Sequence, residues 1–389
     1  MPTIKLPTHD RRLESFELSD SAAWPQRTSA VFNRIAYAAA HVVADPLAHG
    51  DPYLDAAVDW DATMAFRRHI WDLGLGVAEA MDTAQRGTGM DWPASRELIE
   101  RTLDAARDYD GEAIVGCGTG TDQLIPDDAT TVEDVIYAYE EQCAAVEAAG
   151  GRIILMASRA LAACTRSAED YARVYGRILS QIREPVIIHW LGDMFDPALE
   201  GYWGHRDPDS AAEVCLEILE ENAAHVDGIK VSLLDARLEV NMRRRLPPGV
   251  RMYTGDDFNF AELIAGDDQG YSDALLGIFD VTAPAASAAL AALAEDDLDG
   301  YHEILAPTVP LARHIFKAPT QYYKTGVVFM AYLNGLQDHF TLVGGQQSAR
   351  SLLHLCDLFR LADRAQLLRD SDLAVSRMQR VLAVHGVDT

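Results

Sequence analysis

The chain of 389 residues carries 33 Lys and Arg against 60 Asp and Glu, a formal net charge of −27 at pH 7. This acidity argues against nucleic acid or an anionic membrane surface as a main partner, because concentrated Lys and Arg bind phosphate groups. An apolar content of 49% excludes a disordered chain. The length predicts one large domain with an appendage.

The cysteines and the N-terminus indicate a soluble protein of a reducing compartment. Five scattered cysteines without a CxxC pair argue against a zinc ribbon or a disulfide framework. The first 20 residues lack the apolar core of a signal peptide. Since no run approaches the roughly 18 apolar residues of a membrane span, we expect a cytoplasmic protein without a membrane partner.

Short apolar runs alternate with longer amphipathic stretches, which is typical of βα units around a parallel sheet. Eight units at this spacing favour an α/β fold of the (β/α)8 TIM-barrel type, and no Gly-x-Gly-x-x-Gly motif follows the first strand to support a dinucleotide-binding sheet. The predicted strands are Ile35–Val43, Gly76–Met81, Ala113–Gly116, Arg152–Ala157, Pro185–Trp190, Gly228–Leu233, Val250–Thr254 and Ala274–Phe279. The helices predicted between them include Ala62–Leu73, Arg96–Arg107, Val132–Ala149, Ala168–Gln181 and Ala211–Ala224.

The pattern changes after about residue 284, where helices are predicted without intervening strands. These helices are Ala285–Ala294, Leu298–Ile315, Tyr322–Leu336 and Gln347–Arg377. We interpret the first as the last barrel helix and the others as an extension. The predicted organisation is an N-terminal extension over residues 1–30, a barrel over 31–295 and a C-terminal helical extension over 296–389.

Lysine is rare in this chain, since only Lys5, Lys230, Lys317 and Lys324 stand among its 33 basic residues. Lys230 lies inside an apolar segment, the predicted sixth strand. If its side chain points into the barrel, burial lowers its pKa and leaves a nucleophilic amine that can form an imine. The alternative is a lysine at a strand end whose ammonium group reaches solvent.

Four segments carry a resemblance to a known family. Gly228–Lys230 reads Gly-Ile-Lys, Gly255–Asp257 reads Gly-Asp-Asp, Gly116–Gly120 is rich in glycine, and Pro185–Trp190 reads Pro-Val-Ile-Ile-His-Trp. In order and spacing they resemble the dihydrodipicolinate synthase/N-acetylneuraminate lyase superfamily of class I aldolases, and most closely a branch described as a domain of unknown function. The corresponding superfamily motifs are the Schiff-base lysine, a Gly-Asp-Asp turn, an Ala-Gly-Thr-Gly turn and Pro-Val-Ile-Leu-Tyr-Asn. The likeness spans about residues 35 to 345, and it implies a barrel with a helical extension that forms dimers or tetramers.

Two parts of the resemblance depart from the superfamily pattern. The Gly-Thr-Thr-Gly-Glu segment that holds the keto acid's carboxylate is replaced by Met81–Gly87, where only Thr83 offers a comparable hydroxyl. The tyrosine that relays protons is replaced by His189, and a tyrosine-bearing turn by Ala157–Ala160. The resemblance therefore implies Lys230 and His189 as catalytic residues. The residues expected to bind substrate are Asp82, Thr83, Gln85, Arg86, Ser158, Arg159, Asp256 and Asp257.

Each of these side chains also has an ordinary structural interpretation. A histidine titrates near neutrality and can move protons, but His189 could equally be a core residue bonded to a carbonyl. Arg86 and Arg159 could clamp a carboxylate or phosphate, or pair with nearby acids. The three aspartates could bind substrate hydroxyls or cap the following helices.

We therefore expect a Schiff-base lyase or aldolase of carbohydrate metabolism that needs no cofactor and acts by retro-aldol cleavage, condensation or dehydration. The acids and arginines of the rebuilt pocket favour a polyhydroxylated keto acid or keto sugar. A second hypothesis is a metal-dependent isomerase or hydrolase with ligands among His41, Glu79, Asp82, His189 and Asp256. A third is a barrel that has lost catalysis and serves as a binding subunit.

Overall fold

The computed structural model describes residues 1–127 and 129–387, which form two compact units. The barrel unit comprises Arg34–Ala40 and Leu75–Gly277. The helical unit comprises Met1–Asn33, His41–Gly74 and the described residues from 278 onward. Each unit is described separately below.

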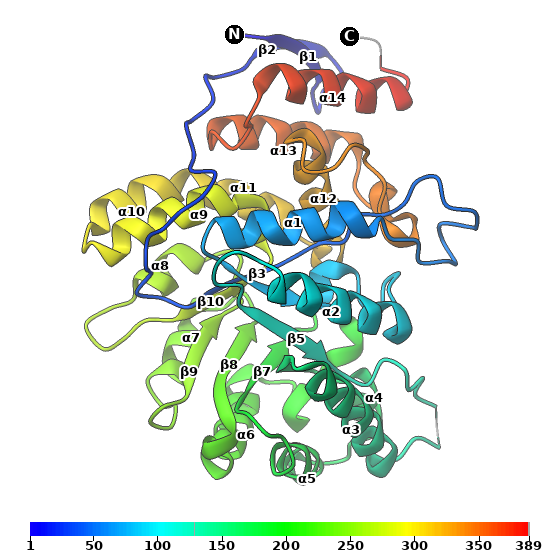
Figure 1. The fold of residues 1–389 in the computed structure, drawn as a ribbon, viewed down its shortest axis with the longest axis vertical. Coiled ribbons are helices and arrows are strands. Elements are labelled where there is room, and N and C mark those ends of the chain that lie inside the picture. The colour runs from blue at the N-terminus through cyan, green and yellow to red at the C-terminus, as the bar shows by residue number, and fades with distance from the viewer. Residues whose placement is uncertain (128, 388–389) are drawn as a thin grey trace. The chain divides into compact units, whose positions relative to one another are not determined.

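The barrel unit contains a closed barrel of eight parallel strands in the order β10-β3-β4-β5-β6-β7-β8-β9 (Figure 1). The predicted fold class and all eight predicted strands are confirmed, with strand ends that shift by a few residues. The strands are β3 (Ala36–Ala39), β4 (Gly76–Glu79), β5 (Val115–Thr119), β6 (Arg152–Met156), β7 (Val186–Leu191), β8 (Val226–Ser232), β9 (Arg251–Thr254) and β10 (Asp273–Leu276).

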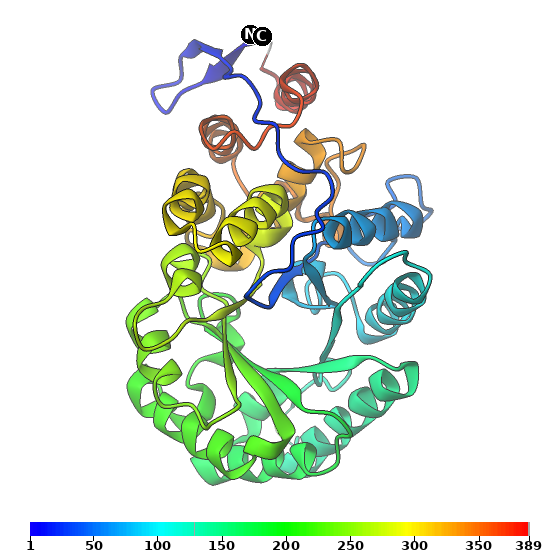
Figure 2. The ribbon, with the colours of Figure 1, turned by 60° about the vertical axis from the view of Figure 1, so that its left-hand side comes forward.

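Helices of this unit surround the strands, and Figure 2 shows the green helices α3 to α7 outside the sheet. Asp side chains cap several of them; Asp207, for example, accepts a hydrogen bond from the backbone N–H of Ser210 at the start of α6. Thr131 and Asp134 form a capping box at the start of α3. The helices are α2 (Trp92–Arg107), α3 (Val132–Ala149), α4 (Arg159–Cys164), α5 (Ala168–Leu179), α6 (Pro208–Glu221), α7 (Ala236–Arg243) and α8 (Phe260–Ala265).

Large and small residues alternate inside the barrel around Tyr37 and Tyr253, and this part of the interior is a packed core. The rings of Tyr37 and Tyr253 meet edge to face with centroids 6.2 Å apart. A Cβ atom on Gly76 would lie 2.7 Å from the Tyr37 ring, and one on Gly228 would lie 2.6 Å from the Tyr253 ring. Because these tyrosines fill the space that the glycines leave, ligand access is left to the opposite, C-terminal ends of the strands.

The helical unit contains α1 (Trp60–Asp72) and the helices that follow the barrel. The long helix predicted over Leu298–Ile315 is broken by a 3-10 turn that contains Pro307, a residue without the backbone N–H that an α-helical hydrogen bond needs. The helix predicted over Gln347–Arg377 is also broken, at a left-handed Gln366 (φ 55°) and the N-cap Asp370. The helices are α9 (Ile278–Ala294), α10 (Leu298–Leu305), α11 (Val309–Ile315), α12 (Tyr323–Leu333), α13 (Leu352–Arg364) and α14 (Ser371–Val384).

A short antiparallel hairpin, β1 (Thr3–Pro7) and β2 (Leu13–Glu17), joins the two ends of the chain within the helical unit (Figure 1). The indole N–H of Trp24 donates to the carbonyl of Gln366 at 2.7 Å, and the backbone N–H of Ser19 donates to Asp363 at 2.9 Å. The sequence did not predict this hairpin. Among the described residues, no helix has the length and apolar content needed to cross a membrane.

Candidate active site

Lys230 lies in the middle of β8, buried inside the barrel unit. It pairs in register with His189 on β7 and with Tyr253 on β9. Because paired residues on neighbouring parallel strands face the same side of a sheet, Lys230 shares the barrel interior with the core residue Tyr253. Ser232 follows two residues later on the same face.

The Gly-Asp-Asp turn after β9 begins with Gly255, and the side chain of Lys230 packs against this glycine. A Cβ atom on Gly255 would lie 2.8 Å from Cε of Lys230 and 2.8 Å from the carbonyl oxygen of Val231, and it would collide with Oγ of Ser232. These approaches are closer than a side chain permits. The glycine therefore leaves the space that the Lys230 side chain occupies.

The environment of Lys230 keeps part of its amine unprotonated near neutrality. Burial lowers the pKa of Lys230 to about 8, against the opposing effect of the nearby Asp257 and Asp82 carboxylates, which raise it. At pH 7 a larger fraction of Lys230 is then a free amine than for a lysine with the ordinary pKa. The side chain thus has the property that imine formation needs.

His189 is also fully buried beside the lysine. Its Nε2 atom lies 3.2 Å from Oγ of Ser232, and within the described residues its Nδ1 atom has no hydrogen-bond partner. Burial and the charge of Lys230 lower the pKa of His189 well below its usual range. The imidazole is therefore neutral at pH 7, and its neighbour is a serine hydroxyl rather than the carbonyl considered in the sequence.

The segment after β4 turns sharply at the C-terminal end of the barrel. Ala80 and Gln85 adopt left-handed backbone conformations, with φ of 51° and 62°, on either side of a 3-10 turn over Asp82–Ala84. Non-glycine residues with positive φ mark a tight local structure that its surroundings hold in place. Thr83 and Gln85 are buried within this turn.

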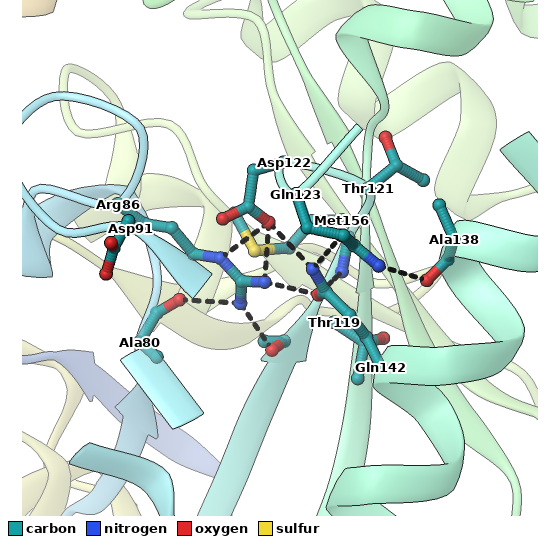
Figure 3. Close-up of polar contacts among 12 residues, drawn as sticks. Ala80, Arg86, Asp91, Thr119, Thr121, Asp122, Gln123, Ala138, Gln142 and Met156 are labelled. Atoms are coloured by element: carbon teal, nitrogen blue, oxygen red, sulfur yellow. Dashed lines mark hydrogen bonds and ion pairs between the residues drawn. The ribbon is translucent and has the colours of Figure 1, made fainter. Parts of the chain in front are cut away.

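Arg86 follows the turn and is held by hydrogen bonds from several directions (Figure 3). Its Nη1 atom donates to the carbonyl of Gly118 at 2.6 Å, and Nη2 and Nε donate to Oδ1 of Asp122 at 2.7 and 3.1 Å. It also donates to the side-chain oxygen of Gln142 on α3 and to the carbonyl of Ala80. The guanidinium group thus joins the turn after β4 to the end of β5 and to α3. Of the two roles considered for Arg86, the structure shows the pairing with a nearby acid, Asp122.

A cavity of about 430 Å³ opens among these segments. Its polar walls include Asp82, Arg86 and Arg159 of the predicted substrate-binding residues. The volume falls within the range of about 300–1,000 Å³ that is usual for small-molecule sites. Lys230 and His189 are not among the described residues that line the cavity, and Asp82 is the lining residue whose charge raises the pKa of Lys230.

Ser158 lies behind the cavity wall and caps α4. Its Oγ atom accepts from the N–H of Leu161 at 2.9 Å and lies 2.6 Å from Oγ1 of Thr121, a residue that lines the cavity. The backbone N–H of Ser158 donates to the hydroxyl of Tyr202 at 3.1 Å. Ser158 therefore positions Thr121, which reaches the cavity in its place.

The remaining predicted residues form an ion pair, accept backbone hydrogen bonds or act on Lys230 through their charge. Arg159 pairs with Asp196 across the cavity wall, and 43% of its side chain stays exposed. Asp256 accepts from the N–H groups of Phe258 and Asn259 at 2.9 and 3.0 Å, as a capping aspartate does. Asp257 is buried and acts on Lys230 through its charge.

The structure also adds residues that the sequence did not suggest. Asp91, Thr121, Asp122 and Asp196 line the cavity, and Ser232 stands between His189 and Gly255. Ser232 could have been found from the two-residue period of a strand, which puts it on the same face as Lys230. Among the described residues, no three His, Cys, Asp or Glu side chains come together as a metal site, so the structure does not assemble the ligands of the metal hypothesis.

Comparison with known proteins identifies one family and one group of solved structures. The family model described as "Protein of unknown function (DUF993)" matches residues 4–387. No curated protein matches the chain. The match covers nearly the whole sequence and confirms the predicted branch.

The solved structures that match share the barrel fold. A prophage protein of the dihydrodipicolinic acid synthase family from E. coli K12, in complex with pyruvate, matches with a TM-score of 0.65 and 13% identity, covering 87% of this chain and 100% of its own. Dihydrodipicolinate synthase from Acinetobacter baumannii, also with pyruvate, gives 0.62 and 15% over 86% and 99%. The enzyme from Oceanobacillus iheyensis gives 0.60 and 14% over 85% and 96%. The predicted resemblance to this superfamily is confirmed, and at these identities it shows a shared fold.

Proposed function

We propose that this chain, which belongs to the DUF993 family of proteins of unknown function, is a Schiff-base-forming lyase or aldolase acting on a keto acid or keto sugar. The observation that carries the proposal is the position of Lys230, a lysine with a lowered pKa inside the barrel and beside His189. The pyruvate complexes of the two structural neighbours, which have the same fold, support a carbonyl compound as the ligand.

The reaction begins with attack of the Lys230 amine on the carbonyl carbon of the substrate. The carbonyl oxygen leaves as water, and a protonated imine forms. A base then removes the proton of a hydroxyl on the second carbon from the imine carbon. The bond between this carbon and the carbon next to the imine breaks, the hydroxyl-bearing carbon leaves as the carbonyl group of the first product, and the electron pair of the broken bond enters the imine to give an enamine. Protonation of the enamine carbon and attack of water release the second product and restore the amine. Condensation is the reverse route.

His189 and Ser232 supply a route for these protons. The imidazole is neutral at pH 7, so it can accept a proton, and its Nε2 atom lies within hydrogen-bond distance of the Ser232 hydroxyl. The same hydroxyl lies against Gly255, where the Lys230 side chain passes. We assign His189 the transfer of protons to and from the imine, with Ser232 as the group that orients it.

Reductive trapping tests this function. Borohydride reduction in the presence of pyruvate or dihydroxyacetone should convert an imine at Lys230 into a stable secondary amine. We expect the mass of the intact protein to rise by one adduct, and peptide mapping to place the adduct on Lys230. The chain has only three other lysines, which simplifies the mapping.

Two substitutions define the controls. Lys230→Arg keeps a cation but cannot form an imine, so the adduct should disappear. Lys5→Arg changes an exposed lysine of the hairpin and should leave the adduct unchanged. An adduct of equal yield in Lys230→Arg would rule out the proposed function.

The cytoplasmic location, the homo-oligomeric state and the place in carbohydrate metabolism stay predictions from the sequence and its resemblance.

A further inference from the structure

His354 on α13 is a buried histidine whose ring makes no hydrogen bond. Only 5% of the residue is exposed, and among the described residues neither Nδ1 nor Nε2 has a hydrogen-bond partner. The ring stacks on that of His314 on α11, with centroids 4.2 Å apart and planes inclined by 17°. His314 Nε2 donates to the backbone carbonyl of His354 at 2.9 Å. The two rings thus lie at the contact between α11 and α13.

The charged groups that act on the His354 ring are cations. The guanidinium group of Arg350 donates to the carbonyls of Lys317 and Pro319 at 2.7 and 3.0 Å, just after the end of α11. The Nζ atom of Lys317 lies 3.5 Å from Nδ1 of His314. Arg350 and Lys317, together with His314 when it is protonated, oppose a positive charge on His354.

The elements packed against α13 offer no carboxylate to balance such a charge. These elements are α11, α12 and β1. None of them contains an aspartate or a glutamate, although acids outnumber bases in this chain by 60 to 33. Besides His314, their charged side chains are Lys5, Arg313 and Lys324. The surroundings of α13 are therefore basic within an acidic protein.

The carboxylates of α13 itself bind the N-terminal segment. Asp357 pairs with His9 at 2.9 Å, in the turn between β1 and β2. Asp363 accepts from the backbone N–H and the hydroxyl of Ser19 at 2.9 and 3.1 Å. Asp357 also favours the charged form of His314, but burial has the larger effect and the pKa of His314 stays below its usual value. Movement of α13 would thus also affect the hairpin.

Protonation of His354 is linked to the packing of α13. Burial and the nearby cations lower the pKa of His354 to about 3, whereas a histidine in an unfolded segment titrates at about 6.5. Between these pH values the packed state binds fewer protons than a state in which the ring reaches solvent. The packed state is therefore increasingly disfavoured as the pH falls below about 6.5.

We infer that His354 is an acid-sensitive latch, whose protonation releases α13 from α11 and, with α13, the hairpin of β1 and β2. The cause is a buried ring that has no acceptor for a second N–H group and no carboxylate among the elements packed against it. The latch lies within the helical unit. It is therefore independent of the imine proposed at Lys230.

Hydrogen exchange of the full chain, followed by mass spectrometry, tests the latch. Amides of α11, α13 and the hairpin are compared at pH 7 and pH 5, with exchange times scaled about tenfold per pH unit for the intrinsic rate. We expect the equilibrium constant for opening of α13 to increase about 20-fold between these pH values. At pH 5 the amides of β8 should remain protected at least about tenfold better than those of α13, because the barrel unit does not take part.

Two substitutions remove the titrating ring. His354→Phe keeps a planar ring for the stack and loses no side-chain hydrogen bond, and His354→Leu repeats the test with a smaller side chain. In either variant the increase at pH 5 should be at least about fivefold smaller. His205→Phe, at an exposed histidine before α6, is the matched control and should keep the wild-type increase.

The outcomes separate the parts of this inference. Constant protection of α13 between pH 7 and pH 5 in the wild-type protein would overturn the latch. Equal protection of α13 and β8 at pH 5 would show that the whole chain opens at once, which also overturns it. An increase of wild-type size in folded His354→Phe or His354→Leu would overturn the assignment to His354.

Discussion

The protonation state of Lys230 reflects two opposing effects. Burial lowers its pKa to about 8, and the carboxylates of Asp257 and Asp82 raise it. The trapping rate should therefore increase with pH and level off above about pH 8, as the free amine becomes the main form. Initial trapping rates of dihydroxyacetone between about pH 6 and pH 10 measure this midpoint.

Removing one carboxylate should move the midpoint in a known direction. Since Asp257 stabilises the ammonium form, Asp257→Asn should lower the midpoint, by about one pH unit. Asp207→Asn, the exposed helix cap, should leave it in place. A midpoint that rises in Asp257→Asn would contradict the assigned electrostatics.

Glu239 is a second buried ionisable group, and it affects stability rather than chemistry. It accepts hydrogen bonds from Ser272 and Thr254 at 2.7 and 2.9 Å, and burial raises its pKa to about 8. In the unfolded chain a glutamate titrates near about 4.3. The folded state therefore holds one more proton between these pH values, and the free energy of unfolding decreases as the pH rises through this window.

Glu239→Gln should remove that dependence. Above about pH 8 the variant should be more stable than the wild-type protein by up to about 5 kcal/mol, whereas below about pH 4 the difference should be small. Urea unfolding at a series of pH values, followed by fluorescence, measures both. Glu217→Gln, an exposed position on α6, should follow the wild-type curve. Parallel curves for Glu239→Gln and the wild type would show that Glu239 is ionised throughout.

At the scale of elements, Arg86 acts as a clamp at the rim of the barrel. It connects the turn after β4, the end of β5 and α3, which are otherwise far apart in the sequence. Breaking a buried ion pair leaves the partner charge without compensation. Arg86→Ala should therefore destabilise the protein by about 3 kcal/mol, as measured by urea unfolding.

The matched control is an arginine whose ion pair lies on the surface. Arg96 pairs with Glu100 one turn along α2, and more than half of its side chain is exposed. Arg96→Ala should cost less than about 0.5 kcal/mol. Equal losses in the two variants would mean that the Arg86 contacts add no stability beyond an ordinary surface pair.

The contacts of Arg86 show which part of the site could not be predicted from the sequence. The sequence drew attention to the segment Met81–Gly87, but the partners of Arg86 lie 36 and 56 positions further along the chain, at Asp122 and Gln142. Spacing along one strand cannot supply such partners. In contrast, Lys230 and His189 could be placed together, because both lie on predicted strands that are neighbours in a barrel.

At the scale of the molecule, the barrel was more predictable than the helical unit. Eight apolar runs bounded by turns marked the strands, because buried parallel strands have near-continuous apolar sequences. The hairpin Thr3–Pro7 and Leu13–Glu17 has no such run; it is short and mostly exposed, and only Ile4 and Leu6 are buried. One break in the C-terminal helices depends on Pro307, and the other on the left-handed Gln366 and the N-cap Asp370. These signals are local, so the helical period alone did not locate the breaks.

The hairpin has a consequence for how the protein is made. The first 24 residues hold Gln366 and Asp363 by hydrogen bonds, so the helical unit uses both ends of the chain. A ribosome delivers the segment with β1 and β2 before the barrel strands, and α13 and α14 after them. The hairpin must therefore wait, unpaired with its helices, until more than 300 further residues have been synthesised. Completion of the helical unit therefore follows the synthesis of all the barrel strands.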